Sequence, residues 1–202
     1  SKVTDLLQLA AHKADNSDEN FREIVLEIEK KHLDTLKQLI PVSEQSALLS
    51  HIKRIINHLE TLLDGCFLLG ELSPRTADTI LSFGELLSSF IIAEALKQNL
   101  KSTNYKDSRE LIKTNATFGK ASVNFEVSNR LIQDYFATNT SKVVLLPGFI
   151  GATEDGITTT LGRGGSDYSA AILASALATE ELEIWTDVNG MYTANPKLVK
   201  QA

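Results

Sequence analysis

Several residue types that define protein classes are scarce in this chain of 202 residues. It contains one cysteine, Cys66, so it cannot form an intrachain disulfide, and this fits a reducing compartment such as the cytoplasm. Its formal net charge is −6, so it lacks the basic excess that binding to nucleic-acid phosphates requires. No apolar run approaches the roughly eighteen residues of a membrane span. We therefore expect a cytoplasmic protein without a nucleic-acid or membrane partner.

The histidines are few, and their spacing does not match a metal site. None lies at ligand spacing from acidic or thiol neighbours, so no metal held by protein side chains is expected: His12, His32, His51 and His58. Apolar residues make up 43% of the chain and charged residues 23%, which is average for a globular domain. A chain of this length can bury a sizeable core as one domain or a domain with an appendage.

The first half of the chain is predicted to be helical. Apolar residues recur at close to helical period over residues 21–40, where Pro41 stops the run. A second stripe over residues 48–63 predicts a helix that forms an antiparallel hairpin with the first. Gly65 is its expected end, although the apolar residues 66–69 could extend it.

A third helix is expected from Pro74 to about Gln98, because Ser73 is a favourable N-cap and proline suits the first helical position. Gly84 lies in its middle and costs about 1 kcal/mol relative to alanine. Close approach of another backbone or of a ligand would explain this glycine. A simple helix–helix contact beside a solvated Glu85 would explain it equally well.

The second half alternates strands and helices, which predicts an α/β fold with a mostly parallel sheet covered by helices. The continuous apolar run at 143–146 is typical of a strand covered on both faces. The expected elements are a strand at 102–106, a loop at 114–119, a helix at 126–138, a strand at 142–146, a helix at 166–178 and a strand at 182–186.

A glycine-rich segment precedes the helix at 166–178. Residues 158–167 read TTTLGRGGSD, so glycines flank Arg163, and Ser166 and Asp167 open the helix. Bare backbone N–H groups and the helix dipole favour anionic oxygen there, and a guanidinium can bind carboxylate or phosphate with two hydrogen bonds. The segment matches neither the P-loop nor the dinucleotide-binding pattern, and a purely structural turn remains the alternative.

A second polar segment follows, and the two together resemble a known family. Residues 185–197 read WTDVNGMYTANPK, which is turn chemistry typical of the end of a parallel strand, where ligands bind. With SFGELLS at 82–88, GFIG at 148–151 and TTTLGRGGSDYSAA at 158–171, this order and spacing resembles aspartokinases. The stretch at 65–85 is most similar to the kinase part of bifunctional aspartokinase–homoserine dehydrogenases.

The resemblance implies an amino-acid-kinase-like three-layer αβα sandwich. It also implies ATP-dependent phosphorylation of the side-chain carboxylate of L-aspartate, with Mg²⁺, at the start of lysine, threonine and methionine synthesis. Arg163 and Asp167 take the catalytic positions. The implied substrate contacts are Thr4, Glu85, Phe149, Arg163, Ser166 and Asp167, and the implied ATP contacts are Thr186, Asp187, Tyr192 and Lys197.

The chain also departs from the family pattern. Lys197 and Asn195 stand where relatives usually have arginine and aspartate, and no lysine-bearing KFGG loop precedes Ser1. We therefore expect residues 1–202 to be a partial catalytic domain, helical over 1–99 and α/β over 100–202, with little or no activity alone. A homo-oligomer is expected of the full-length protein. The alternatives are another kinase of this fold, acting on acetylglutamate, glutamate or uridylate, and a binding or regulatory piece.

Overall fold

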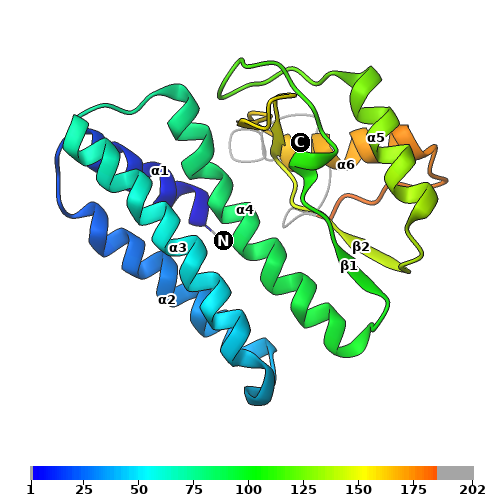
Figure 1. Ribbon diagram of the computed structural model, residues 1–202, viewed down its shortest axis with the longest axis horizontal. Coiled ribbons are helices and arrows are strands. Elements are labelled where there is room, and N and C mark those ends of the chain that lie inside the picture. Colours follow the sequence, from blue (N-terminus) through cyan, green and yellow to red (C-terminus); the bar gives the residue numbers. More distant parts are fainter. Residues whose placement is uncertain (1, 186–202) are drawn as a thin grey trace, which may run out of the picture.

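The computed structural model describes residues 2–185, and its first half is a bundle of four helices (Figure 1). Their bounds are α1 Val3–Asp15, α2 Phe21–Leu39, α3 Val42–Leu69 and α4 Pro74–Asn99. The predicted hairpin of α2 and α3 and the predicted third helix are confirmed. Ser73 caps α4 as expected, because its hydroxyl accepts a hydrogen bond from the Thr76 N–H at 3.1 Å.

Two details of this half differ from expectation. The helix α3 continues through Gly65 to Leu69 and ends at Gly70, whose φ of 61° gives the left-handed conformation typical of a helix C-terminus. The helix α1 was not predicted. It buries residues at helical spacing between α2, α3 and α4, namely Val3, Leu7, Ala10, Ala11 and Ala14.

The second half contains two small sheets and two long helices. Strand β1 (Thr103–Tyr105) pairs in parallel with β2 (Val143–Leu145), and a 3-10 turn, η1 (Ser108–Glu110), follows β1. Strand β3 (Ile150–Ala152) pairs antiparallel with β4 (Thr158–Thr160). Helices α5 (Phe125–Thr138) and α6 (Gly165–Leu177) pack against each other.

This arrangement adds one strand pair to the prediction and corrects one predicted strand. The β1–β2 pair is parallel, as predicted for the sheet, and the antiparallel β3–β4 hairpin lies in residues 147–165, where no strand was predicted. The strand predicted at 182–186 does not form over residues 182–185, where Trp185 is 89% exposed and pairs with no strand. Thr186 lies outside the described residues.

Helix α4 lies between the other three helices and the α/β half (Figure 1). It contacts α1, α2 and α3 on one side and β1 and β4 on the other. By length and composition alone it is apolar enough to cross a membrane, contrary to the expectation that no apolar stretch reaches that length. In this fold it is a central core helix that also carries a buried carboxylate, Asp78.

Candidate functional site

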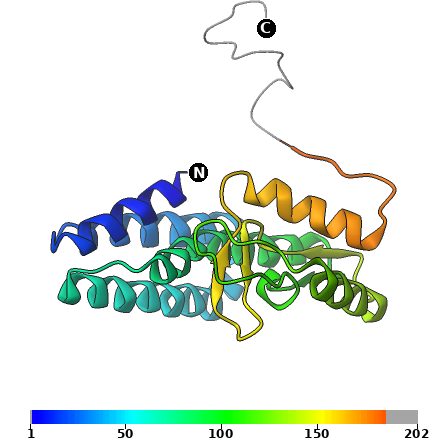
Figure 2. The same cartoon turned by 90° about the horizontal axis from the view of Figure 1, so that it is seen from above.

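A cavity of about 270 Å³ opens where α1, α4 and α6 meet. All six residues predicted to contact the substrate line it, together with three glycines of the 162–165 loop: Thr4, Glu85, Phe149, Gly162, Arg163, Gly164, Gly165, Ser166 and Asp167. Figure 2 shows the N-terminal ends of α1 and α6 facing each other across this region. Two helix N-termini that converge on one cavity favour an anionic group there.

The cationic wall of the cavity is the loop before α6. Gly162 and Gly164 adopt φ values of 77° and 73°, which brings the chain sharply round to the first turn of α6. Arg163 between them is exposed, and within the described residues its guanidinium forms no hydrogen bond or ion pair. Ser166 and Asp167 follow in the first turn of α6. The guanidinium is therefore available to a ligand.

The acidic wall is Glu85 of α4. Its side chain is partly buried, and burial raises the pKa of the carboxyl above its ordinary value of 4.5. Among the described residues no donor reaches this carboxylate; only its backbone carbonyl accepts hydrogen bonds, from Ser88 and Ser89. A partly desolvated acid without a partner is an incomplete pair, and a cationic ligand group would complete it.

Phe149 forms part of the wall in a strained conformation. Its φ of 68° is rare for a residue with a bulky side chain. Two hydrogen bonds hold it: the Phe149 N–H donates to Ser169 Oγ at 3.0 Å, and the Leu161 N–H donates to the Phe149 carbonyl at 2.9 Å. The strain is thus maintained by α6 and by the end of β4, the two elements that flank the Arg163 loop.

Gly84 allows α1 to approach the helix that carries Glu85. A Cβ atom at Gly84 would lie 3.2 Å from Leu7 Cδ1 and 3.4 Å from Val3 Cγ1. The close contact explains the glycine in the middle of α4, and it places Thr4 on the same cavity as Glu85.

The substitution Gly84→Ala is expected to push α1 away from α4. Helix propensity alone would favour alanine by about 1 kcal/mol, so a loss of thermal stability would report the steric contact. We expect a lower melting temperature and weaker binding of the ligand that Thr4 and Glu85 share. Gly65→Ala is the matched control, because nothing lies within 4 Å of a Cβ there; it should raise the melting temperature. A stabilised Gly84→Ala variant would contradict this account.

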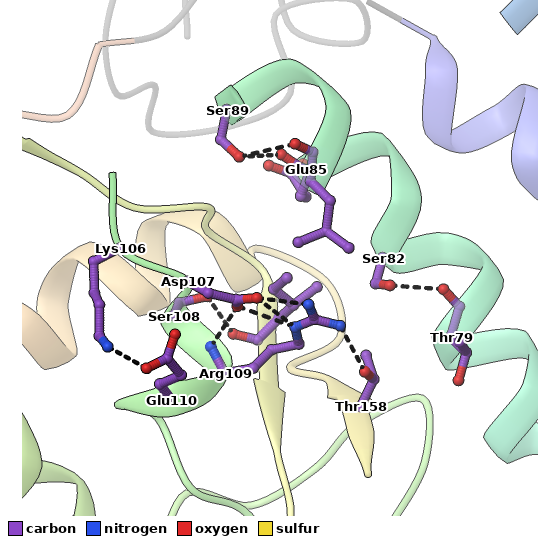
Figure 3. A network of polar contacts seen from close by, with 12 residues as sticks. Thr79, Ser82, Glu85, Ser89, Lys106, Asp107, Ser108, Arg109, Glu110 and Thr158 are labelled. Atoms are coloured by element: carbon purple, nitrogen blue, oxygen red, sulfur yellow. Dashed lines mark hydrogen bonds and ion pairs between the residues drawn. The ribbon is translucent and has the colours of Figure 1, made fainter. Parts of the chain in front are cut away.

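The polar network on the other face of α4 was not found from the sequence. Figure 3 shows Arg109 between Asp107 and Thr158: Arg109 Nη2 donates to Asp107 Oδ2 at 2.6 Å, and Nη1 donates to Thr158 Oγ1 at 3.1 Å. The network ties η1 to the first residue of β4 and lines a larger cavity of about 620 Å³. The only sequence signal was an Asp-x-Arg spacing, which is too common to be informative.

The predicted nucleotide contacts lie outside the described residues; these are Thr186, Asp187, Tyr192 and Lys197. Within residues 2–185, no three His, Cys, Asp or Glu side chains gather to hold a metal ion. The described part of the chain therefore presents the amino-acid side of the predicted site, with an acid and a guanidinium from separate elements on one cavity.

Comparison with known proteins agrees with this geometry. The family model described as the amino acid kinase family matches residues 1–202. Bifunctional aspartokinase/homoserine dehydrogenase 2, chloroplastic, of Arabidopsis thaliana is 31% identical over the whole of this chain and 22% of its own length. Lysine-sensitive aspartokinase 3 of Escherichia coli K12 is 37% identical over 75% of this chain and 33% of its own.

A solved structure has the same fold. E. coli aspartokinase III in complex with aspartate and ADP superposes with a TM-score of 0.88 and 32% identity, over 99% of this chain and 43% of that one. These findings confirm the resemblance to aspartokinases and the predicted fold class. The chain spans less than half the length of each of these relatives. It belongs to the amino acid kinase family.

Proposed function

We propose that the protein containing this chain transfers the γ-phosphoryl group of ATP to the side-chain carboxylate of L-aspartate, forming 4-phospho-L-aspartate and ADP. The observation that supports this most directly is the convergence of Glu85 and Arg163 on one small cavity. The similarity to E. coli aspartokinase III in complex with aspartate and ADP supports the choice of both substrates.

The charges of the cavity match a free amino acid. Aspartate carries one ammonium and two carboxylates, and removing them from water is costly unless each finds a partner. The ammonium group would pair with Glu85. A carboxylate would accept hydrogen bonds from Arg163, from the Ser166 hydroxyl and from the first-turn N–H groups of α6. A cavity of about 270 Å³ suits a ligand of this size better than a larger metabolite.

The transfer itself would need no protein nucleophile. An oxygen of the substrate's side-chain carboxylate forms the new bond to the γ-phosphorus, while the bond from that phosphorus to the β,γ-bridging oxygen breaks and ADP leaves. The protein's part is then to orient the carboxylate and to stabilise charge. Mg²⁺ prefers phosphate oxygens and water as ligands, so it would be bound mainly through the nucleotide.

We infer that Mg²⁺ accompanies the nucleotide and that Thr186, Asp187, Tyr192 and Lys197 contact ATP. We also infer that the product feeds lysine, threonine and methionine synthesis and that the complete protein is a homo-oligomer. The motifs at 158–171 and 185–197 support the nucleotide contacts.

The experiment is an acceptor comparison with the complete gene product. ADP release, and hydroxamate formed when hydroxylamine traps an acyl phosphate, are measured with L-aspartate, L-glutamate, N-acetyl-L-glutamate and UMP. We expect L-aspartate to give the highest kcat/KM and a hydroxamate. N-acetyl-L-glutamate should be poor because it lacks the ammonium that Glu85 would bind. Preference for any of the other three acceptors would refute the proposal.

A further inference from the structure

The buried carboxylate of Asp78 connects α4, which carries Glu85, to β4, which leads into the loop that carries Arg163. Asp78 of α4 is 1% exposed, and among residues 2–185 its side-chain oxygens accept hydrogen bonds only from the α/β half. Asp78 Oδ2 accepts from the Thr160 N–H at 2.8 Å, and Oδ1 accepts from the Thr160 hydroxyl at 2.9 Å. The Gly119 N–H donates to both oxygens at 3.0 Å.

The position of Asp78 in the sequence relates it to the site. It precedes Glu85 by seven residues, or two helical turns, so the two carboxylates lie on the same side of α4. Its partner Thr160 is the last residue of β4 and precedes Arg163 by three residues. One side chain therefore connects the helix that carries Glu85 to the strand that leads into Arg163.

A second contact extends this connection to the glycine-rich loop. The 119–121 segment, which Asp78 holds at Gly119, packs against Gly162, where a Cβ would lie 3.2 Å from the Gly119 carbonyl oxygen. The Ala121 N–H also donates to the Thr160 carbonyl at 2.9 Å. Asp78 thus fixes both the end of β4 and the segment on which the residue before Arg163 rests.

The chemistry of the contact makes it specific. A carboxylate buried from water is tolerated only where hydrogen-bond donors surround it, and here two backbone N–H groups and one hydroxyl do so. Backbone donors cannot change rotamer, so the carboxylate defines where β4 lies along α4. An apolar contact would stabilise the same two elements but would leave their relative position less defined.

We propose that Asp78 is a positioning residue for substrate binding, which sets the separation of Glu85 and Arg163 across the cavity. This positioning role rests on the proposed function in one respect, the identity of the ligand as L-aspartate. The structural part, a fixed placement of α4 relative to β4 and α6, is independent of it.

The kinetic test uses Asp78→Asn in the complete gene product. The substitution keeps the shape but turns an NH₂ group toward one of the donors. We expect kcat/KM for L-aspartate to fall about 10- to 100-fold, mainly through a higher KM, with the KM for ATP nearly unchanged. Thr160→Val, which removes the partner hydroxyl and keeps the two backbone donors, should raise the KM for aspartate by a smaller factor.

The matched control is Ser128→Ala. Ser128 is also fully buried and bonds to backbone, accepting from the Lys113 N–H at 2.9 Å, but it joins α5 to a loop and not α4 to β4. It should lower the melting temperature without raising the KM for aspartate. An Asp78→Asn variant that loses stability yet keeps the wild-type KM would show a purely structural role and overturn the proposal.

A measurement without ligand separates this proposal from the proposed function. Spin labels at Arg75→Cys on α4 and Tyr168→Cys on α6, both exposed positions, report the distance between these helices in a Cys66→Ala background. We expect Asp78→Asn to broaden or shift the distance distribution, and Ser128→Ala to leave it unchanged. If the wild-type protein binds no aspartate, the proposed function fails, and the positioning role is then judged from the interhelical distance alone. An Asp78→Asn distance distribution identical to that of the wild type would refute the positioning role.

Discussion

Replacing Arg163 with alanine is expected to weaken binding of L-aspartate about 10- to 100-fold, which corresponds to the 1.5–3 kcal/mol typical of hydrogen bonds to a charged group. The guanidinium lines the cavity without a protein partner among the described residues, so its removal deletes a ligand contact and disturbs no internal bond. Arg163→Lys should restore part of the affinity, because lysine keeps the charge and loses the bidentate geometry. Calorimetric titration with L-aspartate measures the affinity of the wild-type, Arg163→Ala and Arg163→Lys forms of the complete gene product.

The control for net charge is Arg130→Ala. Arg130 lies exposed on α5, makes no ion pair among the described residues and does not line the cavity. It should bind aspartate like wild type, and its circular dichroism spectrum should match that of Arg163→Ala. Equal losses in both variants would show a general electrostatic effect, and wild-type affinity in Arg163→Ala would refute the assignment of this side chain.

The sequence predicted the helices well because their apolar stripes and caps are local signals. The Ser73-Pro74 start of α4 is an example, since hydroxyl cap and proline act within one turn. The end of α3 was expected at Gly65 with an extension through residues 66–69 left open, because a helix tolerates an interior glycine; the structure shows the extension to Leu69. The helix α1 was missed although its buried residues, such as Ala10 and Ala14, recur at helical spacing.

The candidate site was predictable where charge and glycine coincide, as at Arg163, and where the order of motifs indicated a family. The contact that joins α4 to β4 was not predictable. Asp78 and Thr160 are 82 residues apart, and neither stands out locally from other polar residues of its element. The β3–β4 hairpin was missed for a similar reason, because three-residue strands carry too little alternation to be distinguished from a loop.

Replacing Glu85 with glutamine is expected to stabilise the free protein at neutral pH while weakening aspartate binding about 10-fold or more. Burial raises the pKa of Glu85 above 4.5, so ionisation costs more in the folded than in the unfolded chain. Wild type therefore loses stability as pH rises from below 4.5 through the raised pKa. The glutamine variant avoids this loss, and the two melting temperatures should converge in acid and separate toward neutral pH.

The affinity for aspartate should depend on pH in the opposite direction to stability, through the same carboxyl group of Glu85. The substrate ammonium needs the ionised carboxylate, so wild-type affinity for aspartate should fall as pH drops through the raised pKa of Glu85, and the affinity of the glutamine variant should not. Glu27→Gln is the matched control, since Glu27 is exposed on α2 and far in sequence from the site. Glu27→Gln should change neither the melting temperature nor the affinity for aspartate appreciably. A Glu85→Gln variant that binds aspartate as tightly as wild type at neutral pH would leave the ammonium without its proposed partner, and the amino-acid assignment would then have to be abandoned.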